Sequence, residues 1–587
     1  MFDMALQIPP RAKCVVELGC GKGETGASFL RRQPEASYLG VTADEEDLKE
    51  ASKVLTHAAW ALPEELEMNR LGVSEAEVLI IRREYVRRIP MANLQELISM
   101  LGERGLLLME IDNPAYVKKL LAEIAGEAPS PGCLDRKAAV ASLKEAGLEV
   151  LSLQGIYEAE DRKLKESAAL AAFQESLLSL CQETGQVVRE ADLLAKGFLL
   201  KARREPLDEK ERLLVHTALG ETVVTPRVRI IEPGQFLSTE PGVVTLTEDR
   251  HHISQGIEQQ FNRKIFIRQR ISFSDVEQGL KVLDIIRNMG YLMLSEVDDN
   301  PFASVQTDSR ENASDLPPEQ ELSFLGLHGV QVSTEALADL VRPYNPHVKV
   351  LRNELTELPG KRNYLLEKLQ RLAKGDDYVT FFFGALNRTR EWQEVMPVIT
   401  EAIGKYGSKL RFKVLSDKGF YNALPTDYKE FIGSEEMYGG QFVPYQVYQE
   451  ALHSSDISFL PLRDTAFNRT KSDLKFIESA GHGAVVLASP TVYEKTVREG
   501  RTGFIYRNPR EFGEKLSLLV EDRERRMETA EAAYEYVRRE RLLASHYQER
   551  LNWYREMVDR RQELDEEGSR RLAGWQKNLF KKKGGRP

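Results

Sequence analysis

The sequence contains few cysteines. Only four occur among 587 residues, namely Cys14, Cys20, Cys133 and Cys181, and no two of them form a CxxC pair. This spacing argues against a disulfide framework and against a cysteine zinc site. It favours a protein of a reducing compartment.

Long apolar runs and an excess of positive charge are also missing. No stretch approaches the run of about 18 apolar residues that a membrane-spanning helix needs. The first residues, MFDMALQIPPRAK, lack the apolar segment of a signal peptide. The net charge of −10 gives the chain no general footprint for nucleic acid. We therefore expect a cytoplasmic protein with no transmembrane segment and no nucleic-acid partner. Lysines 581–583 could contact an anionic inner-membrane face, but three are too few for stable attachment.

What the sequence does contain is a repeated alternation of short apolar strands with amphipathic helices. The pattern runs from about residue 13 to 155, restarts near 228, and opens again at 377 with "DYVTFFFGALNRTREW". Such alternation is typical of parallel sheets covered by helices. Because the length exceeds what one hydrophobic core supports, we expect several domains.

We predict the α/β class, with a Rossmann-like first domain, two further Rossmann-like lobes and a helical tail. The expected ranges are 1–205 for the first domain, 206–224 for a charged linker, 225–360 and 361–545 for the two lobes, and 546–587 for a basic-ended tail.

A glycine-rich turn follows the first predicted strand. In "VVELGCGKGETGASFL", Gly19, Gly21 and Gly23 lie between strand and helix, and Glu17 stands at the strand end. Glycine lets a ligand approach the backbone, and the helix start offers free N–H groups. The stretch resembles motif I of the class I methyltransferases, which bind S-adenosylmethionine, and the resemblance covers about residues 10–205. It implies that the three glycines and Glu17 contact that cofactor.

Two departures from the methyltransferase pattern leave the role of this domain open. Thr42 stands where the family has an acid for the ribose hydroxyls, and the first acid is Asp44. The stretch after the fourth strand is "IRREYVRRIP" in place of the usual acidic-aromatic-His sequence. One interpretation is a methyltransferase whose cofactor site includes Thr42 and Asp44. The other is a catalytically inactive domain that docks an acceptor or a partner.

A second candidate site lies in "NRTKSDLKFIESAGHGAVVLAS" (468–489). Thr470 and Asp473 fit a capping pattern, so we expect a helix that starts there and carries Lys471, Lys475 and Glu478 on one face. Two lysines near the positive end of a helix dipole favour a bound anion, such as a diphosphate. Glu478 could accept hydrogen bonds from ribose hydroxyls. The alternative is a solvated charged face.

The surrounding segments resemble the GT-B glycosyltransferases, specifically the large retaining family that uses nucleotide sugars. The donor half is matched by "KSDLKFIESAGHGAVVLASPTVYEKTVREGRTGFIY", "FFFGALNRTREW" and "QFVPYQVYQEALHSSDISFLPL". The acceptor half is matched by "YLMLSEVDDNP" and "LHGVQVSTEALADLVRPY", so the resemblance covers about residues 225–545. It implies catalytic roles for Arg388, Lys471, Lys475 and Glu478, and donor contacts by Gly384, Asn387, Arg390, Val443, Asn468 and Ser472.

Some details of the implied mechanism depart from the family or stay open. Many relatives carry a second glutamate eight positions earlier, where this chain has Thr470, so Asn468 or loop amides would replace it. Cations at the helix start could stabilise the leaving diphosphate, so we expect no metal requirement. In the acceptor lobe, Asp298 and Asp299 are expected to shape the cleft, and His328 is the better histidine candidate for a sugar contact.

These observations predict a glycosyltransferase that uses a nucleoside-diphosphate sugar. The expected acceptors are a bacterial surface glycan, a lipid-linked oligosaccharide or a surface protein such as flagellin. In a bifunctional enzyme the first domain would methylate the same glycan, and in the alternative it is an inactive binding module. A non-enzymatic nucleotide sensor or scaffold is disfavoured by the shared helical phase of the two lysines and Glu478. The sugar, the nucleotide and the oligomeric state are not predicted.

Overall fold

The computed structural model describes most of the chain. The described residues are 3–66, 71–126, 136–158, 167–184, 193–220, 226–249, 256–303, 311, 315–373, 377–433 and 443–582. They form two compact units, which we describe separately. Unit 1 comprises Met1–Arg212 with Ser238–Val243, and unit 2 comprises Leu213–Leu237 with Val244–Pro587.

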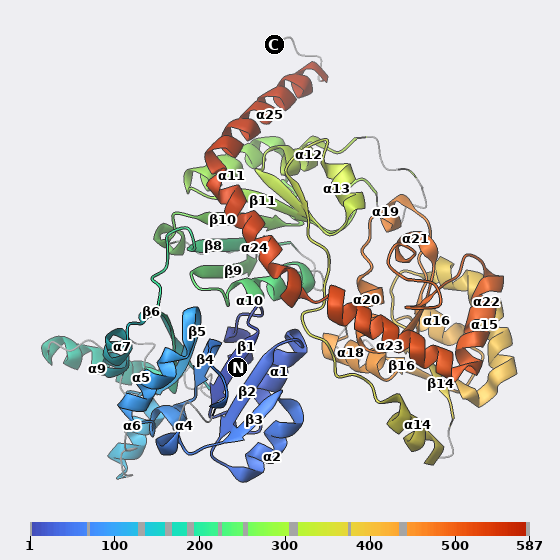
Figure 1. Ribbon diagram of the computed structural model, residues 1–587. Coiled ribbons are helices and arrows are strands. Elements are labelled where there is room, and N and C mark those ends of the chain that lie inside the picture. Colours follow the sequence, from blue (N-terminus) through green and yellow to red (C-terminus); the bar gives the residue numbers. More distant parts are fainter. Residues whose placement is uncertain are drawn as a thin grey trace. The chain divides into compact units, whose positions relative to one another are not determined.

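Unit 1 is built on a seven-stranded sheet (Figure 1). Its strands are β1 (Cys14–Leu18), β2 (Ser37–Thr42), β3 (His57–Trp60), β4 (Ala76–Ile81), β5 (Leu101–Asp112), β6 (Glu149–Ile156) and β7 (Gly197–Arg203). The order is β3-β2-β1-β4-β5-β7-β6, and only β7 runs antiparallel to its neighbours. The strand order reverses between β1 and β4, which is where open α/β sheets bind ligands.

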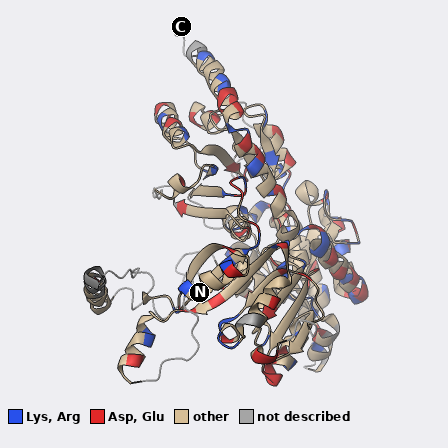
Figure 2. Cartoon of the chain, turned by 60° about the vertical axis from the view of Figure 1, so that its left-hand side comes forward, with Lys and Arg blue, Asp and Glu red and all other residues tan. Residues whose placement is uncertain are grey.

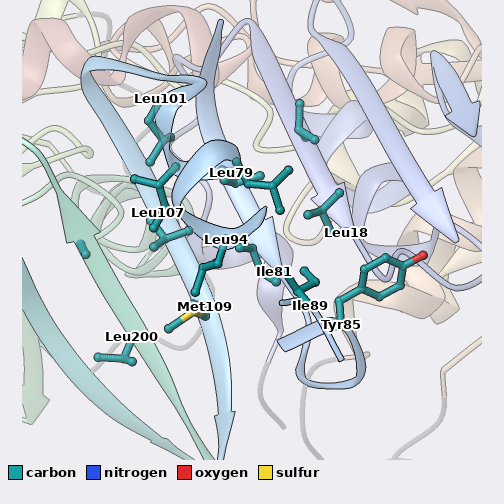
Figure 3. Close-up of a cluster of buried hydrophobic side chains, with 14 of the residues drawn as sticks. Leu18, Leu79, Ile81, Tyr85, Ile89, Leu94, Leu101, Leu107, Met109 and Leu200 are labelled. Atoms are coloured by element: carbon teal, nitrogen blue, oxygen red, sulfur yellow. The ribbon is translucent and has the colours of Figure 1, made fainter. Parts of the chain in front are cut away.

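Helices cover both faces of this sheet. They are η1 (Met4–Gln7), α1 (Glu24–Arg32), α2 (Glu45–Val54), η2 (Pro63–Glu65), α4 (Arg83–Val86), α5 (Met91–Ser99), α6 (Val117–Ile124), α7 (Arg136–Glu145) and α9 (Ala168–Thr184). Because successive strand residues point to opposite faces, Leu79 and Ile81 join one apolar cluster while Val78 and Ile80 join the other. Figure 3 shows the first cluster, in which Leu94 of α5 packs against the strands.

The first lobe of unit 2 contains a six-stranded sheet. Its strands are β8 (Leu213–Leu219), β9 (Val243–Asp249), β10 (Lys264–Gln269), β11 (Leu292–Val297), β12 (Gly329–Val332) and β13 (Val348–Val350), in the order β13-β12-β11-β10-β8-β9. Its helices are η5 (Arg227–Ile231), α10 (Glu232–Leu237), η6 (Ile257–Gln260), α11 (Val276–Asn288), α12 (Pro318–Leu325) and α13 (Glu335–Val341).

Strand β8 lies within the range 206–224 that we expected to be a linker. Six of its seven residues are buried, as in a parallel strand covered on both faces. This strand is difficult to recognise in the sequence, because its residues, LLVHTAL, directly follow the charged connector REPLDEKER.

The second lobe contains a fully parallel six-stranded sheet. Its strands are β14 (Val379–Phe383), β15 (Leu410–Leu415), β16 (Lys429–Ile432), β17 (Ile457–Leu460), β18 (Val485–Ala488) and β19 (Phe504–Ile505), in the order β16-β15-β14-β17-β18-β19. Its helices are α14 (Tyr364–Ala373), α15 (Thr389–Tyr406), η7 (Gly407–Lys409), α16 (Lys418–Ala423), α18 (Tyr445–His453), α19 (Ala466–Arg469), α20 (Leu474–Gly481), α21 (Pro490–Tyr493), α22 (Pro509–Glu521) and α23 (Arg523–Glu540).

The last two helices return to the first lobe. Helix α24 (Leu543–Asp559) packs on α10 and β10, and α25 (Arg561–Lys582) packs on α12, as Figure 1 shows. Tyr554 Oη donates to Gln331 Oε1 at 2.7 Å, and Trp575 Nε1 donates to Glu321 Oε2 at 2.6 Å. In α25 the acidic residues all lie before Gly568 and the charged residues after it are all Lys or Arg, as the colours of the C-terminal helix in Figure 2 show. The predicted class, α/β with parallel Rossmann-like sheets and a helical C-terminal region, is confirmed.

Within the described residues, no helix combines the length and the apolar composition that crossing a membrane requires. Likewise, those residues contain no group of three or more His, Cys, Asp or Glu side chains placed to hold a metal ion.

Candidate functional site

Unit 2 contains a cavity of about 560 Å³. One wall comes from residues that follow the second-lobe strands, including Gly384 after β14 and Leu462 after β17. The other wall includes Asp298 and Asp299, which follow β11 of the first lobe. The cavity thus lies at the carboxyl edges of two parallel sheets, where such folds bind ligands, and its size suits a small molecule.

Helix α20 begins at Leu474, later than the sequence predicts. Asp473 is its N-cap residue but makes no side-chain cap, and the Thr470 hydroxyl donates to the Phe467 carbonyl at 2.9 Å. The expected capping pair is therefore wrong. Lys471 precedes the helix, Lys475 is in its first turn and Glu478 is one turn further along. All three still line the cavity.

The reason for the later start is that residues 470–473, the α20 entry segment, are held one by one from elsewhere in unit 2. Thr334 Oγ1 donates to the Thr470 carbonyl at 2.8 Å, and Lys471 Nζ donates to Asp299 Oδ1 at 2.8 Å. Asn353 Nδ2 donates to Ser472 Oγ at 2.8 Å. The buried Arg541 guanidinium donates to both carboxylate oxygens of Asp473, at 2.5 and 2.8 Å. These contacts fix the segment before the first helical turn.

Glu478 is a buried carboxylate surrounded by donors. It is 3% exposed, and it accepts hydrogen bonds from Tyr448 Oη at 2.8 Å and from Tyr445 Oη at 3.2 Å. Lys475 Nζ lies 3.4 Å from Glu478 Oε2 and 4.0 Å from the Tyr448 ring centroid. Burial, followed by the charge of Glu478, raises the pKa of the Tyr448 phenol well above its usual value. Both phenols therefore stay protonated and keep donating to the carboxylate.

Arginines add positive charge at two further points of the cavity. Arg388, the N-cap residue of α15, lies with Nη1 3.5 Å from Glu391 Oε1. Arg227 lies over the Tyr445 ring at 3.0 Å and 3.3 Å from Glu232. Both guanidinium groups reach the cavity while a carboxylate balances each charge.

The glycine-rich turn of unit 1 adopts the backbone that its sequence predicts. Gly19, Gly21 and Gly23 all have positive φ, at 87°, 52° and 84°. A Cβ on Gly19 would lie 2.6 Å from Glu84 Oε1 and 2.8 Å from the Arg82 Cβ. The space beside Gly19 is thus taken by residues that follow β4, whereas a Cβ on Gly21 would meet only Asp47 Oδ2, at 3.9 Å.

The polar side chains at this edge of the sheet form hydrogen bonds and ion pairs with one another. Glu17 Oε2 accepts from Tyr38 Oη at 2.8 Å, and Glu17 Oε1 accepts from Arg82 Nε at 2.9 Å. Arg82 also pairs with Glu110 at 2.5 Å and donates to Thr25 Oγ1 at 2.8 Å. Burial is the largest influence on the pKa of Glu17 and raises it. A cofactor ammonium group would have to compete with Arg82 for this carboxylate.

At the end of β2, Thr42 and Asp44 bond backbone groups of their own segment. Thr42 Oγ1 accepts from the Asp44 N–H at 3.3 Å, and Asp44 Oδ1 caps α2 by accepting from two backbone N–H groups at 2.8 and 2.9 Å. Tyr85 Oη donates to the Ala61 carbonyl, which directly follows β3, at 2.8 Å, and Figure 3 shows its ring beside Leu18. The predicted cofactor residues Glu17, Thr42 and Asp44 thus all have hydrogen-bond partners within unit 1.

Comparison with known proteins classifies the part of the chain that carries the cavity. Residues 390–555 match the family model described as "Glycosyl transferase-like". We call this part of the chain the glycosyltransferase-like domain, after the family to which it is similar. None of the curated proteins matches the chain.

Three solved structures are similar to the chain at low identity. A glycosyltransferase from Rickettsia africae is 13% identical, with a TM-score of 0.41, and the match covers 59% of this chain and 99% of that one. Anabaena Alr3699/HepE, in complex with UDP and glucose, is 12% identical, with a TM-score of 0.37, and the match covers 58% and 98%. An S-adenosylmethionine dependent methyltransferase from Mesorhizobium loti is 14% identical, with a TM-score of 0.25, and the match covers 34% and 96%.

Most of the residues predicted for the sugar-donor and acceptor sites meet in one cavity at the glycosyltransferase-like domain. The cavity is lined by Gly384, Arg388, Val443, Lys471, Ser472, Lys475 and Glu478 of the second lobe and by Asp298 and Asp299 of the first. Gly384 is required there by packing, because a Cβ would lie 2.4 Å from the Phe382 ring.

Four of the residues predicted for the donor and acceptor sites are not brought to this cavity. Asn387 (φ +58°) and Arg390 are exposed, on the turn before α15 and in its first turn. Asn468 is buried in α19, where its Nδ2 donates to the Arg463 carbonyl at 3.0 Å. His328 precedes β12, at the opposite end from the carboxyl edge, and its Nε2 lies 2.9 Å from Asp565 of α25. It joins the C-terminal helix to the first lobe.

Sequence reasoning missed several residues beside the glycosyltransferase-like domain's cavity. Arg270 follows β10, and its guanidinium bonds both Asp298 and Asp299. Tyr445 and Tyr448 lie one turn apart on α18, a spacing visible in "PYQVYQ". The sequence shows Arg270 as a polar residue at a strand end. It does not show that Arg270 contacts Asp298 and Asp299, because these follow a different strand.

Proposed function

We propose that this protein transfers a sugar from a nucleoside-diphosphate sugar to a glycan, lipid-linked or protein acceptor. The observation that carries the proposal is the cavity at the α20 start, where Lys471, Lys475 and Arg388 converge with the helix N-terminus. Cations and free N–H groups at a helix start bind phosphate. The family match of residues 390–555 supports the same activity.

In the proposed reaction, the nucleoside diphosphate leaves with growing negative charge. Arg388, Lys471, Lys475 and the α20 dipole would stabilise that charge, which lowers the barrier to breaking the glycosidic bond. These groups supply the positive charge within the chain, so the proposal includes no divalent metal. Retention of the anomeric configuration is proposed on the GT-B resemblance alone.

Glu478 is proposed to accept hydrogen bonds from the donor's ribose hydroxyls. Its carboxylate is held by Tyr445 and Tyr448, so its orientation is set before any ligand arrives. Preorganisation of this kind reduces the entropy lost on binding. Asp298 and Asp299 would face the acceptor from the first lobe, and bacterial surface glycans and flagellin remain candidate acceptors.

For unit 1 we favour a role without methyl transfer, as a module that docks the acceptor or a partner. The Glu17–Arg82 pair, the Asp44 cap and the side chains packed beside Gly19 support this choice. No step of the proposed reaction uses S-adenosylmethionine.

Donor turnover tests the proposed function. The purified full-length chain is incubated with a panel of uridine and guanosine diphosphate sugars without acceptor, and released nucleoside diphosphate is measured by mass spectrometry. We expect one donor to be hydrolysed, and Lys475→Met to slow release by about tenfold or more because one stabilising cation is lost. Lys495→Met, which removes an exposed lysine of the same lobe, serves as the matched control.

Two results would contradict the proposal. One is full activity of Lys475→Met with the donor that the unmodified chain uses. The other is a chain that releases nothing from the panel and binds neither UDP nor GDP by calorimetry. Thermal unfolding of each variant shows whether a loss of activity reflects a loss of folding.

A further inference from the structure

Lys471 already has an anionic partner in the cavity. Its Nζ lies 2.8 Å from Asp299 Oδ1, and this contact joins the second lobe to the first. The two side chains are 27% and 32% exposed, and both line the cavity. A diphosphate that enters here meets a lysine whose charge is balanced by a carboxylate.

Asp299 is held in place from its own lobe. The Arg270 guanidinium bonds Asp299 and its neighbour Asp298 together. Arg270 has a left-handed backbone (φ +51°), and its N–H donates to the Glu296 carbonyl at 3.1 Å. Asp299 is thus fixed by its lobe and is not free to follow Lys471.

The residues on either side of Lys471 are held as well, whereas the Lys471 side chain is held at its ammonium group, by Asp299 and by the Phe467 ring 4.4 Å away. Thr334 holds the Thr470 carbonyl, and Asn353 holds the Ser472 hydroxyl. Asn353 Oδ1 in turn accepts from the buried Arg229 at 2.8 Å. Movement of the Lys471 ammonium group toward a ligand therefore requires side-chain rotation alone.

We infer that Asp299 competes with the ligand for Lys471. A nucleoside diphosphate must therefore displace the Asp299 carboxylate from this lysine to bind. The inference rests on the proposed function for the identity of the ligand. A carboxylate beside a diphosphate is repelled by it, and a lysine shared between two anions binds each less strongly. Donor binding consequently breaks one contact between the lobes and leaves Asp299, still bonded to Arg270, facing the acceptor side of the cavity.

A double-mutant cycle tests this inference on the full-length chain. UDP and GDP binding is measured by calorimetry for the unmodified chain, Asp299→Asn, Lys471→Met and the double variant. We expect Asp299→Asn to tighten binding at least threefold and Lys471→Met to weaken it at least threefold. In the Lys471→Met background, the gain from Asp299→Asn should shrink, because the competition for the lysine no longer exists and only the repulsion between carboxylate and diphosphate remains.

The matched control is Asp339→Asn. It removes the same charge from an exposed position of the first lobe, where Asp339 pairs with Arg342 on α13. We expect it to leave the affinity unchanged. Asparagine at position 299 keeps an oxygen that can accept from Arg270, so the local fold is retained, and circular dichroism at the titration temperature verifies it.

The outcomes separate this inference from the proposed function. If the unmodified chain binds neither nucleotide, the proposed function fails. If it binds and Lys471→Met weakens binding, but Asp299→Asn leaves affinity unchanged or weakens it, the function stands and the competitor role fails. The competitor role also fails if Lys471→Met binds as tightly as the unmodified chain, or if the gain from Asp299→Asn is undiminished with Lys471→Met or appears equally with Asp339→Asn.

Discussion

At the scale of single residues, Glu232 is a half-buried acid that shares its surroundings with the cavity. It pairs with Arg227 at 3.3 Å, and the charges of Glu478 and Glu357 also act on it. Burial is the largest influence, and it raises the pKa of Glu232 from 4.5 to about 7. Arg227 and a hydrogen bond from Thr356 act in the opposite direction.

This raised pKa predicts a pH-dependent stability. The folded chain holds the proton more tightly than the unfolded chain, so the contribution favours folding below pH 4.5 and is lost as the pH rises through about 7. At about 1.4 kcal/mol per unit of pKa, the unfolding free energy of unit 2 should fall by about 1–3 kcal/mol across this window. Urea unfolding at pH 5 and pH 8 should show the fall in the unmodified chain, and Glu232→Gln should lack it. Identical pH dependence in both proteins would contradict the buried placement of Glu232.

At the scale of elements, the α20 entry segment determines where helix α20 starts. Arg541, in the crossing between α23 and α24, is 1% exposed and bonds Asp473 through two hydrogen bonds and the Asn353 carbonyl through one. Arg541→Ala would leave a half-buried carboxylate without this partner, at a cost of about 3–5 kcal/mol. We expect a lower melting temperature and UDP or GDP binding weakened at least threefold.

Arg539→Ala removes an exposed arginine of α23 and should change stability by less than about 1 kcal/mol. Equal effects of the two variants would contradict the assigned role of Arg541.

The same elements show how far the sequence can predict this molecule. Strand β7 and the strand–helix alternation can be predicted from apolar patterns, because each pattern involves only a few neighbouring residues. The convergence of Lys471, Lys475 and Glu478 was predicted, but the helix start was not, because Asp473 is bonded by a residue 68 positions away. His328 was misplaced for a similar reason, since its partner Asp565 lies 237 positions away. In unit 1, Thr42 and the arginine-rich stretch after β4 indicated a departure from the methyltransferase pattern. Only the structure shows that Arg82 donates a hydrogen bond to Glu17.

At the scale of the whole molecule, the two units have separate hydrophobic cores and should unfold and bind ligands separately. We expect calorimetry of the full-length chain to show two transitions. UDP or GDP at 100 times its dissociation constant should stabilise one of them by about 2.7 kcal/mol, because it binds the folded unit 2 only. S-adenosylhomocysteine should move neither, because Arg82 occupies Glu17 and Asp44 caps α2.

Arg82→Ala assigns the two transitions. This substitution should lower the unfolding free energy of only one transition, the one that nucleotide leaves unchanged, by about 3–5 kcal/mol. The reason is that the substitution leaves the buried Glu17 carboxylate without its ion pair. Arg88→Ala is the matched control, because Arg88 pairs with the exposed Glu64 and should cost less than about 1 kcal/mol. A shift of the unit 1 transition with S-adenosylhomocysteine would overturn the docking role and restore a methyltransferase. A single transition that moves with nucleotide and with Arg82→Ala would instead mean that the units unfold together, so that occupancy of the sugar-donor cavity stabilises the docking module as well.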